Sequence, residues 1–110
     1  MDKLDNFLKY STLFLYYSEL FSERQKKYLE LYLEENESLS EIAEKYEITR
    51  QAVFDNIKRG FKQLDEYEEK LGMFEKEKKL KRKLKNLRDN FTKENLEKII
   101  EDFDYNEVLS

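Results

Sequence analysis

The chain has 110 residues, of which 42% are charged, and its formal net charge is −4 at pH 7. It contains no cysteine, no histidine and no proline, and only two glycines. This composition excludes disulfides, thiolate or imidazole metal sites and the usual nucleophile–base pairs, so we expect no enzyme, no bound metal and no cofactor. The shortage of turn-forming residues favours an all-α protein made of long helices.

The N-terminal region has no basic segment followed by an apolar run, which a signal peptide would require. Its densest apolar stretch, Leu13 to Tyr17, is far too short to cross a bilayer. We therefore expect a cytoplasmic protein that does not insert into a membrane.

The first predicted helix carries apolar residues at helical spacing, and we expect it to be buried against the rest of the chain. Its stripe consists of Leu4, Phe7, Leu8, Phe14 and Leu15, widened by Tyr10, Leu13, Tyr17 and Leu20. Ser22 then fits the cap of a second helix, which we expect to run to about Glu35. The residues of this second helix that should face inward are Tyr28, Leu29 and Tyr32.

The segment from Ser38 to Phe61 has the pattern of a helix-turn-helix. Ser38 and Glu41 form a capping-box pattern that opens a short helix ending at Tyr46. The hydroxyl of Thr49 is expected to cap the helix that follows. A unit of this kind can lay its second helix in the major groove of DNA.

The predicted turn between these two helices consists of Glu47 and Ile48, with the Ile48 side chain directed into the core. Ala43 is small enough to let the two helices cross closely. Two residues depart from the usual motif. Glu47 stands where a left-handed backbone often takes glycine, at a cost of about 1 kcal/mol. Asn56 lies close to the core side, where an apolar residue is commoner.

The helix after Thr49 is predicted to continue past Phe61, because its apolar stripe continues to Leu71. Gly72 either ends this helix or only weakens it. Beyond it we expect a second stripe and, after a cap at Thr92, a last helix; the second stripe is Met73, Leu80, Leu84, Leu87 and Phe91. We thus predict a sigma region 4-like helix-turn-helix domain over residues 1–71. Residues 72–110 form a long C-terminal helical extension that packs on this domain or on a partner.

The charge is unevenly distributed along the chain. Residues 50–63 carry +3 and residues 76–88 carry +7, whereas residues 1–49, 64–75 and 89–110 carry −5, −4 and −5. Duplex affinity depends heavily on neutralising phosphates, and acidic residues crowd the helix-turn-helix: Glu34, Glu35, Glu37, Glu41, Glu44 and Glu47. A single copy should therefore bind duplex weakly, and dimerisation would be needed to help.

The outward face of the helix after Thr49 supplies the candidate nucleic-acid-binding residues Arg50, Gln51, Phe54, Lys58, Arg59 and Lys62. Arg50 suits guanine and Gln51 suits adenine, while the lysines and Arg59 suit phosphate. Asp55 on the same face would accept only from cytosine and would repel phosphate. The face equally suits a contact with protein or RNA, or a solvated surface with no direct role.

The basic stretch at residues 76–88 has two interpretations. It is suited to gripping the phosphates of RNA or DNA. It is equally suited to being the solvated face of a coiled-coil-like helix, with its lysines matched against acidic helices. We favour the second interpretation, because Leu80, Leu84 and Leu87 hold an apolar seam within the stretch.

From Leu15 to about Leu64 the chain resembles region 4 of bacterial sigma factors. More closely, SLSEIAEKYEITRQAVFDNIKR followed by LDEYEEKLGMFEK is similar to the YlxM family of Gram-positive bacteria, and this resemblance covers roughly residues 10–90. Its most distinctive string is RQAVFDNIKR, from Arg50 to Arg59.

The resemblance implies an all-α helix-turn-helix protein with no catalytic residue. Genes of this family usually lie beside those for the signal recognition particle GTPase or its receptor. It therefore implies a DNA-binding protein and a regulator of that protein-targeting pathway. Because the acidic helix-turn-helix is ill-suited to duplex DNA, our first hypothesis is that the basic surfaces bind the particle's protein or its small RNA. The alternative is a transcriptional regulator that reads a palindromic DNA site as a homodimer, joined through the stripe at residues 64–91.

Overall fold

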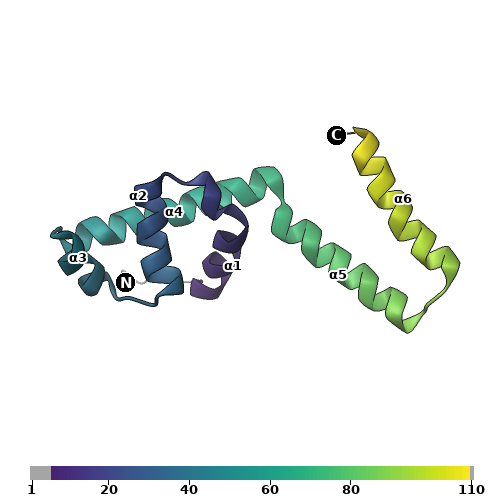
Figure 1. Cartoon of the computed structure of the whole chain (residues 1–110), viewed down its shortest axis with the longest axis horizontal. Coiled ribbons are helices and arrows are strands. Elements are labelled where there is room, and N and C mark those ends of the chain that lie inside the picture. The colour runs from purple at the N-terminus through teal and green to yellow at the C-terminus, as the bar shows by residue number, and fades with distance from the viewer. Residues whose placement is uncertain (1–5, 110) are drawn as a thin grey trace. The chain divides into compact units, whose positions relative to one another are not determined.

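The computed structural model describes residues 6–109, with side chains described as far as Phe103. The described residues form six α-helices and no strand (Figure 1): α1 (Phe7–Tyr17), α2 (Glu23–Leu29), α3 (Leu39–Tyr46), α4 (Arg50–Leu71), α5 (Met73–Asp89) and α6 (Lys93–Leu109). A 3₁₀ turn, η1 (Ser18–Leu20), follows α1, and a π-helical turn, η2 (Glu30–Glu34), continues α2. The predicted all-α fold with a C-terminal helical extension is confirmed. None of these helices is long and apolar enough to span a bilayer.

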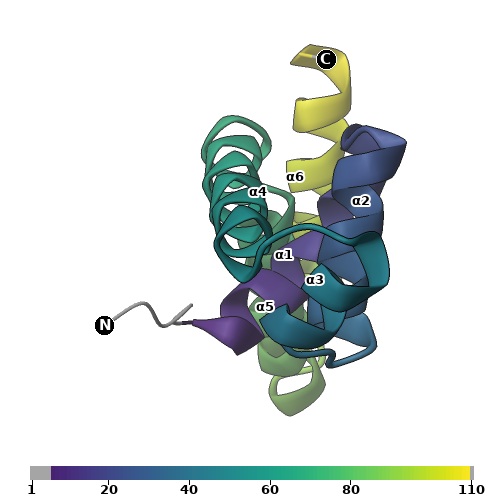
Figure 2. The ribbon, with the colours of Figure 1, turned by 90° about the vertical axis from the view of Figure 1, so that its left-hand side faces the viewer.

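The chain divides into two compact units, one ending at Phe74 and the other beginning at Glu75. In the first unit α1, α2 and α3 all pack against α4 (Figure 2). Its core takes side chains from every helix of the unit: Leu13, Phe14, Tyr17, Phe21, Tyr28, Leu29, Leu31, Leu33, Leu39, Ile42, Ala43, Val53, Ile57, Phe61 and Leu64. These fifteen buried apolar residues form one continuous cluster, which holds the helices α1 to α4 in a fixed arrangement.

The crossing of α2 and α4 is unusually close at Gly60. A Cβ atom there would lie 2.8 Å from Nε2 of Gln25, and 2.8 and 3.0 Å from the two terminal methyl carbons of Leu29. The room left by the missing side chain lets Leu29 become fully buried. It also lets the side-chain amide of Gln25 donate a hydrogen bond to the backbone carbonyl of Asn56, at 2.7 Å. Gly60 therefore sets how closely α2 can approach the middle of α4.

We predict that Gly60→Ala destabilises the protein by about 1–2 kcal/mol, because the added methyl group overpacks a filled site. The higher helix propensity of alanine, about 1 kcal/mol, offsets only part of this cost. Urea unfolding followed by circular dichroism would measure the change. In a Leu29→Ala background, where space has been opened, the same substitution should cost much less. An unfolding midpoint at or above that of the unsubstituted protein would contradict the close crossing.

The apolar stripe predicted for the first helix is broader than the face that is buried. Leu13, Phe14 and Tyr17 are buried, but Leu8 and Leu15 are 80% and 74% exposed. Leu8 and Leu15 are seven residues apart and so share a helix face, which in α1 is turned away from α4. The predicted burial of both was wrong; Leu20 is also half exposed, and Leu4 lies outside the described residues.

The second helix differs from a regular α-helix where it meets η2. The amide of Glu35 donates to the carbonyl of Glu30, five residues earlier, at 3.0 Å. This wider turn shifts the angular positions of the side chains that follow. Leu31 and Leu33 both become buried, and Tyr32 is only half-buried. The sequence prediction assumed regular α-helical spacing. The π-helical turn is the reason that this prediction placed Tyr32 on the inward face and missed Leu31 and Leu33.

α4 ends at Gly72, whose backbone is left-handed with φ 60° and ψ 28°. The first turn of α5 is then held by α1 and α4. The Tyr17 hydroxyl donates to Oε1 of Glu68 at 2.6 Å and accepts from the amide of Met73 at 3.0 Å. The same carboxylate oxygen accepts from the amide of Phe74 at 3.1 Å. Two amides that a helix N-terminus leaves without helical partners are satisfied in this way.

We predict that Tyr17→Phe lowers the unfolding free energy by about 1–2 kcal/mol, because it keeps the buried ring but removes the hydroxyl from both hydrogen bonds. Burial raises the pKa of Tyr17, and the hydrogen bond to the Glu68 carboxylate raises it further. Its contribution is therefore complete below the unfolded pKa, near 10, and is lost as pH rises through the folded pKa.

The difference in unfolding free energy between the protein and Tyr17→Phe should accordingly shrink above about pH 10. Tyr32→Phe is the matched control, because the Tyr32 hydroxyl makes no hydrogen bond to a described residue although burial also raises its pKa. Equal losses of stability for the two variants at neutral pH would show that the hydroxyl of Tyr17 is not needed.

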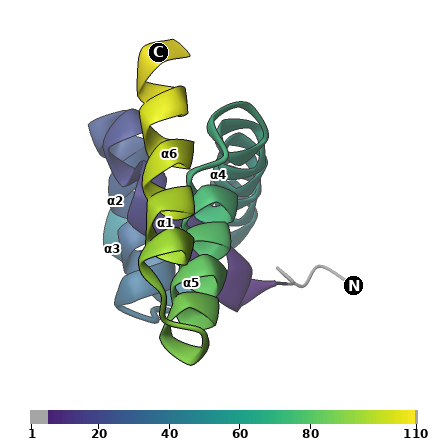
Figure 3. The same cartoon turned by 90° about the vertical axis from the view of Figure 1, so that its right-hand side faces the viewer.

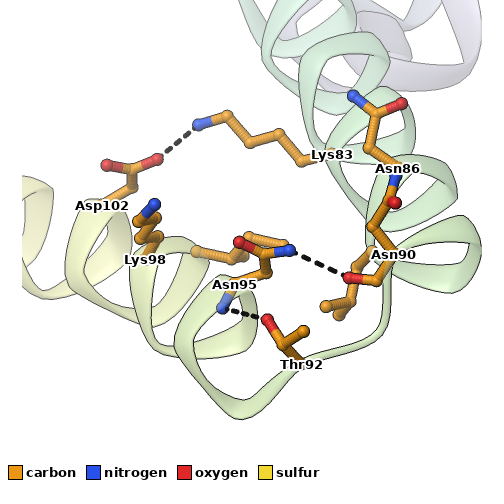
Figure 4. A pocket seen from close by; sticks show the side chains of 9 residues that line it. Lys83, Asn86, Asn90, Thr92, Asn95, Lys98 and Asp102 are labelled. Carbon is orange, nitrogen blue, oxygen red and sulfur yellow. Dashed lines mark hydrogen bonds and ion pairs between the residues drawn. The ribbon is translucent and has the colours of Figure 1, made fainter.

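The second unit is a helical hairpin made of α5 and α6 (Figure 3). Thr92 stands at the turn, where its hydroxyl accepts a hydrogen bond from the amide of Asn95 at 3.0 Å. Lys83 of α5 forms an ion pair with Asp102 of α6 (Figure 4). Among the side chains of the hairpin described up to Phe103, Leu87 is the buried apolar one, whereas Phe91 of the predicted stripe is 73% exposed.

Candidate nucleic-acid interface

The helix-turn-helix is built by α3, α4 and the turn between them, and its first helix begins with a complete capping box. The Ser38 hydroxyl accepts from the amide of Glu41 at 3.0 Å, and the Glu41 carboxylate accepts from the amide of Ser38 at 2.7 Å. The hydrogen bond from the Ser38 backbone amide is the main cause that lowers the pKa of Glu41. The ionised carboxylate is therefore part of the helix cap.

The turn closes through the left-handed backbone of Glu47, with φ 54° and ψ 44°. The amide of Ile48 donates to the carbonyl of Ala43 at 3.0 Å, and the half-buried Ile48 packs against the core. Thr49 then starts α4, because its hydroxyl accepts from the amide of Ala52 at 3.0 Å. A glutamate thus stands in a conformation that glycine or asparagine adopts at less cost.

We predict that Ser38→Ala lowers the unfolding free energy by about 1 kcal/mol, because the amide of Glu41 loses its acceptor at the start of α3. Ser40→Ala is a matched control in the same helix, since Ser40 is exposed and makes no side-chain hydrogen bond to a described residue. It should change stability by less than about 0.5 kcal/mol. Thermal or urea unfolding would measure both, and equal effects would argue against the cap.

α4 presents five of the six sequence-predicted binding residues to solvent: Arg50, Gln51, Lys58, Arg59 and Lys62. Gln51, Lys58, Arg59 and Lys62 fall within about 100° of helix rotation and so share one side of α4. Arg50, nine residues before Arg59, points about half a turn away from it. Phe54 differs, because its ring is half-buried and packs against the core. Nζ of Lys58 lies 5.9 Å from the centre of that ring. Phe54 therefore anchors this face to the core and is less available to a ligand than the other five residues.

Several polar groups on this face already have partners within α4. Nε2 of Gln51 donates to Asp55 at 3.0 Å, so a bidentate contact with adenine would first require that bond to break. Arg59 donates to Oδ1 of Asn56 at 2.8 Å, and Asn56 in turn donates to the carbonyl of Ala52 at 3.0 Å. These bonds hold the guanidinium of Arg59 over the half-buried Asn56, which explains why a polar residue is tolerated near the core.

The acidic residues around the motif are partly used by the fold. Glu37 forms an ion pair with Lys45 at 2.9 Å, and Glu41 closes the capping box. Glu34, Glu35, Glu44 and Glu47 are exposed. Because they stand on the helices beside α4, their charges reduce the positive potential that the basic face of α4 can offer to phosphate.

The residues that sequence patterns missed are those that position the face, above all Gly60 and Gln25. A glycine in the middle of a helix lowers helix stability by about 1 kcal/mol relative to alanine. A glycine at such a position often marks a close contact, and this was the signal that the sequence offered. Nothing in the spacing of Gln25 indicated its bond to Asn56. Within residues 6–103 no group of three acidic side chains is placed to hold a metal ion.

Comparison with known proteins relates the chain to a family of the same kind. Residues 4–103 match the model of a family named UPF0122 and described as "Putative helix-turn-helix protein, YlxM / p13 like". A UPF0122 protein of Fusobacterium nucleatum subsp. nucleatum is 50% identical over 98 residues, which cover 89% of this chain and 95% of that protein. The match continues beyond residue 90, where the resemblance had been expected to fade, and so includes most of α6.

Two further relatives are similar along most of their length. A UPF0122 protein of Halalkalibacterium halodurans is 44% identical over 105 residues, covering 92% of this chain and 96% of that protein. A UPF0122 protein of Bacillus pumilus is 45% identical over 86 residues, which cover 78% of each chain.

Proposed function

The chain belongs to the UPF0122 family of YlxM-like helix-turn-helix proteins, as its resemblance predicted, and from this premise we propose that it is a regulatory protein that binds nucleic acid through α4. One observation supports this most: Lys58, Arg59 and Lys62 project from one exposed side of α4, opposite the side that buries Val53, Ile57, Phe61 and Leu64 in the core. Cations on a rigid helix face are suited to phosphate contacts.

We further propose that this activity serves the signal recognition particle pathway, with the particle's RNA or its GTPase as the partner. The genetic association implied by the YlxM resemblance supports the pathway. The exposed glutamates on the helices beside α4 support a partner other than plain duplex DNA, which depends more heavily on phosphate neutralisation. Such a protein would act in the cytoplasm and without catalysis.

The alternative function is a dimeric transcriptional regulator that reads a DNA site through Arg50 and Gln51. The dimer seam is expected over residues 64–91, but not all of its apolar residues are exposed. Leu64 is completely buried in the core of its own chain, and Gly72 ends α4 within the stretch. A dimer would therefore have to use the exposed apolar residues of the hairpin instead, such as Leu84, Phe91 and Ile100.

The function can be tested by measuring binding of the full chain to three partners in parallel, across a salt series. The partners are a duplex DNA of random sequence, the particle RNA and the particle GTPase. Binding to the RNA or the GTPase that exceeds binding to the duplex supports the targeting pathway. Binding that prefers one promoter sequence over random duplex supports the alternative. No binding to the RNA or the GTPase refutes the targeting pathway, and equal binding to promoter duplexes and random duplex refutes the alternative.

We predict that Lys62→Ala weakens nucleic-acid binding to a similar extent for all sequences and lowers the slope of log K against log salt by about 1. The reason is that a phosphate contact carries no sequence information. Fluorescence anisotropy would measure the slope. Lys70→Ala is the matched control, since it removes the same exposed charge from the last turn of the same helix. Identical slopes for the two variants would exclude the α4 face as the contact.

A further inference from the structure

The basic side chains of α5 are divided between two faces of the helix. One face is turned towards α6, where Lys83 pairs with Asp102 and Leu87 is buried (Figure 4). Leu80 lies next to Lys83 in the hollow that also contains Asp102 and Phe103. On this face the pairing of Lys83 with Asp102 fits the expectation that lysines of this segment are matched against an acidic helix.

The other face carries a strip of four cations, here called the α5 strip: Lys78, Lys81, Arg82 and Lys85. These four side chains are exposed and line one shallow hollow, with no carboxylate or apolar residue among them. Lys78 is approached by Glu75 at 3.6 Å. Within the described part of the chain, none of Lys81, Arg82 and Lys85 has a carboxylate oxygen within the 4.0 Å of an ion pair.

The four cations of the strip repel one another, and Glu75, Glu77 and Asp89 offset part of this repulsion at spacings of three and four residues. Like charges three and four residues apart destabilise a helix by about 0.2–0.5 kcal/mol per pair. Lys78 and Lys81, Lys78 and Arg82, and Lys81 and Lys85 are all such pairs. Among the residues whose side chains are described, the ion pair from α5 to α6 is made by Lys83 on the other face and does not balance the strip. An external anion would remove the repulsion.

We propose that the α5 strip binds the phosphate backbone of a double-stranded nucleic acid, as a second contact that adds to the α4 face. The inference rests on the proposed function, since it assumes the same ligand. Seven residues of helix rise about 10 Å between Lys78 and Lys85. That length matches about three steps of a nucleic-acid strand, at about 3.4 Å per step. The strip is thus long enough to neutralise two to three phosphates of one strand.

Other partners fit the α5 strip less well. A protein interface needs an apolar centre surrounded by polar residues, and the strip has none. A helix lying on a membrane needs its apolar side free to enter the bilayer, but the apolar side of α5 faces α6. A row of cations without apolar residues is what a phosphate backbone requires. Contacts of this type position a nucleic acid and do not read its sequence.

The test compares three variants of the full chain for binding to a duplex DNA and a duplex RNA of the same sequence, over a salt series. Glutamine keeps the helix propensity and most of the side-chain stem. The strip variant is Lys78→Gln, Lys81→Gln, Arg82→Gln and Lys85→Gln. The control variant removes four exposed lysines elsewhere, Lys27→Gln, Lys70→Gln, Lys93→Gln and Lys98→Gln. The third variant is Lys58→Gln, Arg59→Gln and Lys62→Gln, on the α4 face.

We expect the strip variant to lower the slope of log K against log salt by about 2–3, at about 0.9 per phosphate of duplex DNA. The control variant, with the same change in net charge, should alter the slope by less than half as much. Circular dichroism should show unchanged helix content in all three. A preference of the strip for RNA or for DNA will appear as a larger loss with that duplex.

A strip variant that behaves like the control variant overturns the inference. If the α4 variant loses binding in the same experiment, the proposed function stands without the second contact. If the unsubstituted chain binds neither duplex, the inference falls, and the proposed function is then decided by binding to the particle RNA and the GTPase. Polyglutamate serves as a competitor: displacement of the duplexes by polyglutamate as readily as by unlabelled duplex would show general attraction to polyanions and would also overturn the inference.

Discussion

The close crossing of α2 and α4 at Gly60 is the constraint on which the helix-turn-helix unit depends. A single hydrogen in place of a side chain lets Leu29 fill the space against α4 and lets Gln25 reach the backbone of Asn56. With α2 fixed there, one side of α4 is committed to the core through Val53, Ile57 and Phe61. The cations Lys58, Arg59 and Lys62 are then left on the opposite side. The basic face is thus a consequence of how the core is packed.

Charge in this protein has separate structural and binding roles. Glutamates that looked simply repulsive to phosphate include Glu41, which caps α3, and Glu37, which pairs with Lys45. The lysines of α5 divide in a similar way, because Lys83 holds α6, whereas Lys81, Arg82 and Lys85 make no ion pair with a described residue. A net charge of −4 therefore says little about binding until the paired charges are set aside. The cations that concern binding are then those that share one face of a helix, on α4 and on α5.

The parts of the fold that depend on local chemistry could be predicted from the sequence. Caps at Ser38 and Thr49 depend on residues three positions away, and the burial of Val53 and Ile57 follows from helical spacing. Features that depend on distant neighbours could not. The π-helical turn η2 and the exposure of Leu8 and Leu15 are decided by which helices are available to pack against, and spacing within one helix does not contain that information. For the candidate site, the residue types on α4 could be predicted, but their bonds to one another could not.

The hydrogen bonds at the start of α5 also separate two regions whose backbone amides should exchange their protons with solvent at different rates. The amides of Met73 and Phe74 are held by Tyr17 and Glu68, so they should exchange their protons with solvent only when the core of the first unit opens. Beyond them, Leu87 is the buried apolar side chain among the hairpin residues up to Phe103. Its amides should exchange far sooner, as a separate cooperative unit. The boundary between slow and fast exchange would then fall within the first turns of α5, not at the end of α4.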